Sequence, residues 1–86
     1  MDKYDKAKLK VLIKMILLER CPKKTTANQL ANIINENTWG FRTDISSNII
    51  SSLMKNELKK TDNHFMNMIK SANWRTGIVY WIPSKK

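Results

Sequence analysis

The strongest constraint on the fold is a run of β-branched and aromatic residues near the carboxyl end of the chain, Ile78–Ile82. Residues of these types favour extended backbone, in which their side chains pack on a pleated surface. The apolar segment 65–71 precedes this run, and residues 72–76 between the two are suited to a turn. Gly77 is able to take a positive φ where such a turn closes. The pattern predicts a two-stranded hairpin over about 65–83.

The first strand of this hairpin has a competing interpretation. Phe65, Met66, Ile69 and Ala72 also fit one face of a helix whose amino terminus Asp62 would cap. The sequence leaves open whether residues 62–72 form a strand or a helix.

Three segments ahead of the hairpin have helical periodicity, at about 2–19, 26–35 and 45–59. The first ends at the Cys21–Pro22 pair, because a residue before proline is driven out of the α region. The second opens on threonines that can cap its first amides. We therefore expect one domain over 1–86, mainly α with a β-hairpin, in the α+β class.

The first helix has more apolar residues than one face can hold. Tyr4, Val11, Met15 and Leu18 recur at helical spacing and are predicted to face the core, which leaves Leu9, Ile13 and Leu17 as surplus. If Ser71 pairs with Gly77, both faces of the hairpin are apolar too; one carries Met66, Met68, Ile78, Tyr80 and Ile82, and the other Phe65, Ile69, Val79 and Trp81. Because monomers rarely expose large apolar patches, we expect a homodimer formed through the first helix, the hairpin or both.

The chain is strongly basic, with 16 Lys and Arg against 7 Asp and Glu, for a formal charge of +9. Eight basic residues lie in 1–24 and seven in 55–86, whereas 25–54 is almost neutral. An anionic partner is the first expectation, with nucleic acid ahead of acidic protein or membrane. The lysines of the first helix, Lys3, Lys6, Lys10 and Lys14, are interpreted as a solvated face.

Several classes of function are not favoured. One cysteine, Cys21, and one histidine, His64, are too few for a disulfide or a tetrahedral zinc site, and they fit a reducing cytoplasm. The longest apolar stretch, 11–18, is too short to span a bilayer. His64 has no nucleophile or paired carboxylate beside it, and no glycine-rich phosphate loop is present. We expect no enzyme activity, no cofactor and no metal.

Two segments and the closing strand resemble the winged helix-turn-helix family of DNA-binding domains. Residues 25–31, Thr-Thr-Ala-Asn-Gln-Leu-Ala, look like the opening of its second helix, and residues 45–54 look like its recognition helix. Residues 80–83, Tyr-Trp-Ile-Pro, resemble the last strand of its wing. The resemblance covers residues 7–83 and implies duplex DNA binding, with the third helix in the major groove and the hairpin as a wing on the backbone or minor groove. The chain departs from the family in the eight to ten residues between Ile34 and Ile45, where three or four are usual.

The residues that would contact DNA follow from this resemblance and from their chemistry. Asn48 can pair with adenine, small serines let a helix lie deep in a groove, and Arg75 at the hairpin tip suits a narrow minor groove. The predicted DNA-binding set is Thr26, Arg42, Thr43, Ser46, Ser47, Asn48, Ser51, Ser52, Lys55, Asn73, Arg75 and Thr76. Of the three tryptophans, Trp39 and Trp81 are predicted to be core and Trp74 to be exposed.

The sequence therefore favours a cytoplasmic, nucleoid-associated regulator of transcription that binds double-stranded DNA. A winged-helix module that docks on other proteins is the main alternative, and an RNA-binding protein is the second, supported only by charge.

Overall fold

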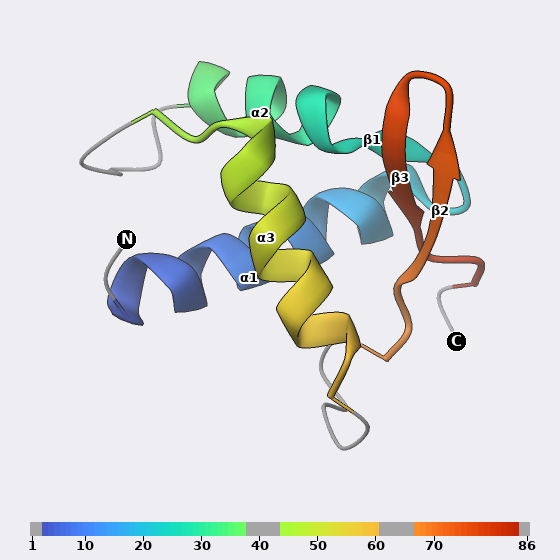
Figure 1. Ribbon diagram of the computed structural model, residues 1–86, viewed down its shortest axis with the longest axis horizontal. Helices are drawn as coiled ribbons and strands as arrows, with labels where there is room; N and C mark the ends of the chain where they lie inside the picture. The colour runs from blue at the N-terminus through green and yellow to red at the C-terminus, as the bar shows by residue number, and fades with distance from the viewer. Residues whose placement is uncertain (1–2, 38–43, 61–66, 85–86) are drawn as a thin grey trace.

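A computed structural model describes residues 3–37, 44–60 and 67–84. In chain order its elements are α1 (Lys3–Arg20), β1 (Thr25–Thr26), α2 (Ala27–Glu36), α3 (Ser47–Leu58), β2 (Lys70–Trp74) and β3 (Gly77–Trp81) (Figure 1). The described part of the chain is thus α+β, with three helices and an antiparallel sheet. All three predicted helices are confirmed to within two residues at each end.

The sheet has three strands where the sequence predicted two. Its order is β1-β3-β2, so the strong run of apolar residues in β3 is central. Strand β1 is only two residues long and pairs Thr25 with Tyr80 and Thr26 with Val79. A segment this short has no alternating pattern of its own, so the threonines were predicted only as a helix cap. The Arg20 Nε atom donates to Thr25 Oγ1 at 2.9 Å and joins the end of α1 to this strand.

The hairpin is shorter than predicted and has another register. Trp74, and not Ser71, pairs with Gly77, which leaves a two-residue turn. Gly77 has φ of +120°, the positive value that the turn was expected to require. The helical alternative for 62–72 is wrong at its end, because β2 begins at Lys70; the part of it over 61–66 lies outside the described residues.

The new register changes which apolar residues share a face. Ile69, just before β2, is buried with Tyr80 and Ile82 in the core, whereas the sequence analysis placed it on the opposite face with Val79 and Trp81. Ser71 and Asn73 follow Ile69 at every second position and therefore share its face. The inner face of this strand is thus apolar only at its start. Both faces of the hairpin still carry apolar residues, but the residues that share each face differ from the prediction.

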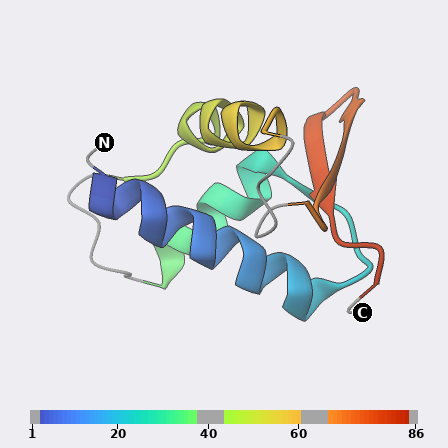
Figure 2. The same ribbon diagram turned by 90° about the horizontal axis from the view of Figure 1, so that it is seen from below.

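The predicted faces of the first helix are reversed. Leu9, Ile13 and Leu17, predicted to be surplus, are fully buried against α2, α3 and the sheet. Three of the predicted core residues are exposed instead, with relative exposures of 87% for Tyr4, 44% for Val11 and 55% for Met15. Figure 2 shows what covers the buried side: α3 and the hairpin lie to one side of α1, and α2 crosses behind it.

Helix α2 begins at the threonine cap that its sequence predicted, and α3 begins at a serine cap, Ser46, close to its predicted start. Thr26 Oγ1 accepts from the Gln29 amide at 3.1 Å, and Gln29 Oε1 accepts in return from the Thr26 amide at 3.0 Å. Ser46 Oγ accepts from the Ile49 amide. At the far end of α2, the Asn35 side chain both donates to the Ile45 carbonyl and accepts from its amide, each at 2.8 Å. Asn35 therefore fixes the start of α3 against the end of α2.

One ion-pair cluster joins α1 to α3. The buried Glu57 carboxylate lies 3.1 Å from Lys10 Nζ and 3.3 Å from Lys60 Nζ. Burial by itself would raise the pKa of Glu57, but the hydrogen bonds and charges of the two lysines outweigh it and hold the pKa below its ordinary value. Lys10 was predicted to belong to a solvated face, so for this residue the prediction is wrong.

Across 3–37, 44–60 and 67–84, no helix is long and apolar enough to cross a membrane.

Candidate nucleic-acid interface

The surface of α3 that faces away from the core is a stripe of polar and basic residues. Asn48, Ser52, Lys55 and Lys59 are all exposed and recur at i, i+4, i+7 and i+11, so they lie on one side of the helix. We call these four residues the α3 stripe. The opposite side of the same helix contributes the fully buried Ile50 and Met54 to the core. This separation is the one that the sequence predicted.

The hairpin runs alongside α3 with its tip near the start of the helix (Figure 1). A hollow of about 290 Å³ lies where the tip, α3 and the start of α2 meet. Its lining includes four of the predicted DNA-binding residues, Thr26, Ser47, Ser51 and Thr76. The fold thus brings together residues that are up to fifty positions apart in the sequence.

The start of α2 adds two features to this hollow. Thr26 is the cap of the helix, and the exposed Asn28 lines the hollow from its first turn. The first amides of a helix lack intrahelical partners and carry its partial positive charge, which favours anions. Asn28 was not predicted as a site residue, although its position two residues after a predicted cap placed it on an exposed helix start.

A second hollow, of about 320 Å³, lies farther along α3. It is lined by Lys55 and Lys59 from the helix and by Asn73, Ile78 and Tyr80 among the hairpin residues. Two lysines, an asparagine and an aromatic ring thus line one hollow. Lys59 was missed by the sequence prediction, although it follows Lys55 by one helical turn.

Ser51 has a partner inside the protein. Its hydroxyl lies near the phenol of Tyr80. Burial raises the pKa of Tyr80, and the neighbouring Ser51 hydroxyl only partly offsets that rise. The contact joins α3 to the central strand of the sheet. Ser51 is therefore placed between helix and hairpin and not on the outward stripe with Asn48 and Ser52.

The remaining predicted residues lie at the hairpin tip, at the start of α3 or outside the described residues. Arg75 and Thr76 form the turn between β2 and β3, and both are exposed. Ser46 is exposed as the cap of α3. Arg42 and Thr43 lie outside the described residues, as does Trp39.

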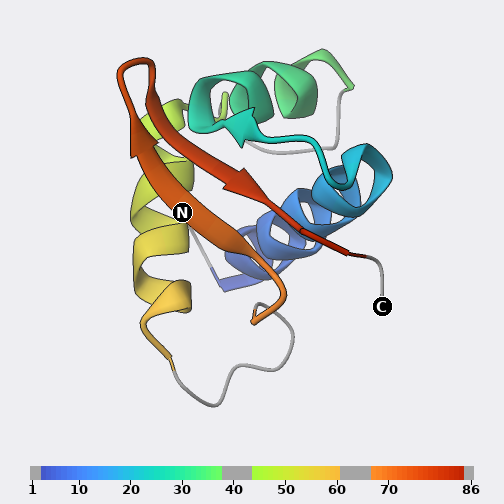
Figure 3. The same ribbon diagram turned by 90° about the vertical axis from the view of Figure 1, so that its right-hand side faces the viewer.

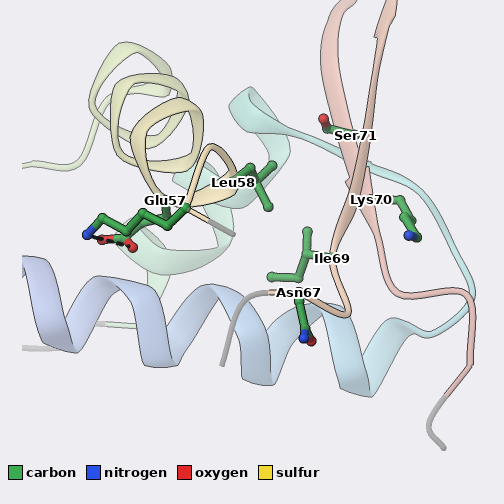
Figure 4. Close-up of a pocket in the computed structure, with 7 residues that line it drawn as sticks. Glu57, Leu58, Asn67, Ile69, Lys70 and Ser71 are labelled. Atoms are coloured by element: carbon green, nitrogen blue, oxygen red, sulfur yellow. Dashed lines mark hydrogen bonds and ion pairs between the residues drawn. The ribbon is translucent and has the colours of Figure 1, made fainter. Parts of the chain in front are cut away.

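A third hollow, of about 340 Å³, lies between the end of α3 and the start of β2. Figure 4 shows Ile69, Asn67 and Leu58 around it, with Glu57 on the side toward α1. Among the described residues that line it, Glu57 is the only acidic one, and its carboxylate is already bound by two lysines. A carboxylate held ionised in this way is poorly suited to act as a general acid or base.

Within the described ranges, no three His, Cys, Asp or Glu side chains are grouped so that they could hold a metal ion. Comparison of the chain with protein-family models, with curated proteins and with solved structures finds no match.

Proposed function

We propose that the protein binds double-stranded DNA as a winged helix-turn-helix regulator of transcription. In this proposal α3 enters the major groove, and the β2–β3 hairpin is the wing that meets the backbone or minor groove. The observation that carries it is the α3 stripe, a polar, exposed helix surface. It is flanked on the hairpin side by two hollows whose lining includes five further predicted residues, Thr26, Ser47, Ser51, Asn73 and Thr76.

The chemistry of the α3 stripe supports reading of base edges. Asn48 has the donor and acceptor pair that matches adenine in the major groove, and Ser52 is small enough to let the helix approach the bases closely. From Asn48 to Lys55 the helix rises about 10 Å, which corresponds to about three base pairs. A single recognition helix therefore has room to read a short half-site.

The charges support a nucleic acid as the partner. Lys55 in α3 and Lys59 at its C-cap line the second hollow, Arg75 is exposed at the hairpin tip, and the whole chain carries a formal charge of +9. The start of α2 opens toward the hollow at the tip, where the positive end of the helix dipole would favour a phosphate. Phosphate contacts of this kind orient a protein on a duplex without reading its sequence.

The experiment that tests this function is a titration of labelled duplex DNA followed by fluorescence anisotropy, repeated from low to physiological salt. If about five phosphates are neutralised, log affinity should fall against log salt with a slope of about −4 to −5. Single-stranded DNA, RNA and an acidic polypeptide are titrated in parallel. Affinity for duplex that does not change with salt, or stronger binding of structured RNA, would refute the proposal.

Arg75 gives the wing its own test. Arg75→Ala should weaken duplex binding by about 1 to 2 kcal/mol and leave the melting temperature unchanged, because the residue is exposed at a two-residue turn. A lower melting temperature with unchanged duplex affinity would show that Arg75 has a structural role.

We also propose that two copies associate through α1. Tyr4, Val11 and Met15 are exposed and spaced at i, i+7 and i+11, so they form one apolar stripe on this helix. A two-fold dimer would cover it and present two α3 helices to major grooves about 34 Å apart, on a palindromic site. Sedimentation equilibrium tests the proposal: Val11→Lys with Met15→Lys should give the mass of one chain, and a wild type that already has that mass refutes it.

A further inference from the structure

We propose that the outer face of the sheet binds single-stranded DNA by stacking its bases on Trp74 and Trp81. Side chains alternate between the two faces of a strand, so the pairing of Trp74 with Gly77 places Trp74, Val79 and Trp81 on one face. The other face carries Tyr80 and Ile82, which are buried in the core. Figure 3 views the molecule from the side of the hairpin, which lies in front of the helices.

The two rings on this outer face share one cation. Lys24 Nζ lies 5.5 Å from the centroid of the Trp74 ring and 5.0 Å from that of Trp81. Both distances are within the range of cation–π attraction. Because both ring centroids lie near the same lysine nitrogen, the two rings cannot be far apart. They are close enough to stack on neighbouring bases of one strand. Trp81 was predicted to be a core residue, but in the structure Trp81 is half-buried and lies on the outer face.

The rings are open to a ligand in spite of this contact. Trp74 has a relative exposure of 52%, and Lys24 is exposed as well. Val79, between them on the same face, is almost completely buried, so the tryptophans stand on an ordered apolar floor. A lysine that leaves a ring for a neighbouring phosphate exchanges one favourable contact for another, and the ring is then free to stack on a base.

The charge around the rings favours an anionic partner over an apolar peptide. Lys23, Lys24 and Lys70 are exposed beside the tryptophans, and neither the segment 22–26 nor the segment 67–84 contains an acidic residue. Aromatic side chains within a basic surface are how proteins hold single strands without reading their sequence. Duplex DNA would not use this surface, because its bases are already stacked on one another and do not present their faces.

The choice of DNA over RNA rests on the proposed function; the stacking itself does not. Trp74 is followed directly by Arg75 at the hairpin tip, so the outer face continues from the surface proposed to hold duplex DNA. A strand that leaves the end of that duplex would reach the tryptophans without crossing the core. Single-stranded RNA of the same length is therefore the arm of the experiment that tests this choice.

The experiment measures binding of the full chain to a labelled 15-residue oligo(dT) by fluorescence anisotropy, with a 20-base-pair duplex and oligo(rU) as parallel ligands. Trp74→Ala should weaken oligo(dT) binding about tenfold, the loss expected for one stacked base, and leave duplex binding unchanged. Asn48→Ala should do the reverse. These two opposite patterns separate failure of this inference from failure of the duplex proposal.

Matched variants separate stacking from loss of apolar surface. Tyr4→Ala removes an aromatic side chain that is even more exposed but lies on α1, and it should leave the affinity for oligo(dT) unchanged, whatever it does to duplex binding through the proposed dimer. Trp74→Phe keeps a ring and should lose less than Trp74→Leu, which keeps apolar cover but has no π face. Equal losses in the Phe and Leu variants, or an oligo(dT) affinity unchanged in Trp74→Ala, overturn the stacking proposal. Tighter binding of oligo(rU) than of oligo(dT) overturns the choice of DNA.

Discussion

Helices α1 and α3 are both rich in apolar residues, but only α3 separates its apolar and polar residues onto opposite faces. In α3 the buried Ile50 and Met54 lie opposite the exposed Asn48 and Ser52, as the spacing predicts. In α1 apolar residues occur on nearly every side, and the side that is buried is not the predicted one. The face that a helix buries follows from its own sequence where the two sides differ; where they do not, the neighbouring elements decide it.

The largest test of this comparison is a pair of substitutions in α1. Leu17→Ala should lower the free energy of unfolding by about 2 to 5 kcal/mol, because it empties a fully buried position. Met15→Ala, two residues away on the exposed side, should change it by less than about 0.5 kcal/mol at concentrations where the protein is a monomer. Urea denaturation of the two variants measures both values. Equal losses would mean that α1 is buried on both sides.

The next effect concerns the contact between the two helices. Glu57→Gln should lower the free energy of unfolding by about 2 kcal/mol near neutral pH, because it removes the charge that Lys10 and Lys60 bind. Both lysines are partly exposed, so each can return to water in the variant and the loss stays moderate.

The same carboxylate predicts a pH dependence. Because the pKa of Glu57 is lowered in the folded state, the unfolded chain takes up the proton first as the pH falls. The stability that Glu57 contributes is complete above its ordinary pKa of about 4.5 and is lost as the pH falls through the lower folded value. The difference in stability between wild type and Glu57→Gln should therefore shrink from pH 6 toward pH 3. A difference that is constant over this range would show that the ion pair is not formed.

The sequence predicts the features that depend on local signals and misses those that depend on contacts between distant elements. The helix caps Thr26 and Ser46 and the stop at Pro22 are local signals, and the structure confirms them. Strand β1 could not be predicted, because two threonines form a strand only when β3 lies beside them. The hairpin register was wrong because apolar residues before β2 allowed more than one pairing, and the choice depends on packing against the core.

The candidate site, like the fold, was predicted where it depends on helical spacing and missed where it depends on long-range contacts. The α3 stripe follows from helical spacing alone, so Asn48, Ser52 and Lys55 were found. The partner of Ser51 and the position of Trp81 depend on contacts between elements distant in the sequence, and no local pattern carries that information.

A third prediction compares the two polar sides of α3. Asn48→Ala should change which duplex sequences are bound, with a loss of about 1 to 3 kcal/mol for the preferred site, because a base contact is removed. Ser51→Ala should instead lower the free energy of unfolding by about 1 kcal/mol, since it removes the hydroxyl beside the buried Tyr80 phenol, and should keep the preferred sequence. Selection from a random duplex library measures the preference. A changed preference in Ser51→Ala and not in Asn48→Ala would show that the reading surface faces the hairpin.

The smallest expected effect distinguishes residues within the α3 stripe itself. Lys55 lies one and two turns beyond Ser52 and Asn48 on the same side of the helix, at the rim of the second hollow, and its ammonium is expected to meet a phosphate and not a base. Lys55→Ala should therefore weaken all duplex sequences alike and reduce the steepness of the salt dependence by about one unit of slope, because one fewer counterion is released. Lys6→Ala, on the side of α1 away from Tyr4, Val11 and Met15, removes the same charge from the whole molecule and is the matched control; its slope should equal that of the wild type. A loss confined to particular sequences would make Lys55 a base-reading residue, and equal changes in both variants would mean that overall charge, and not the α3 stripe, holds the DNA.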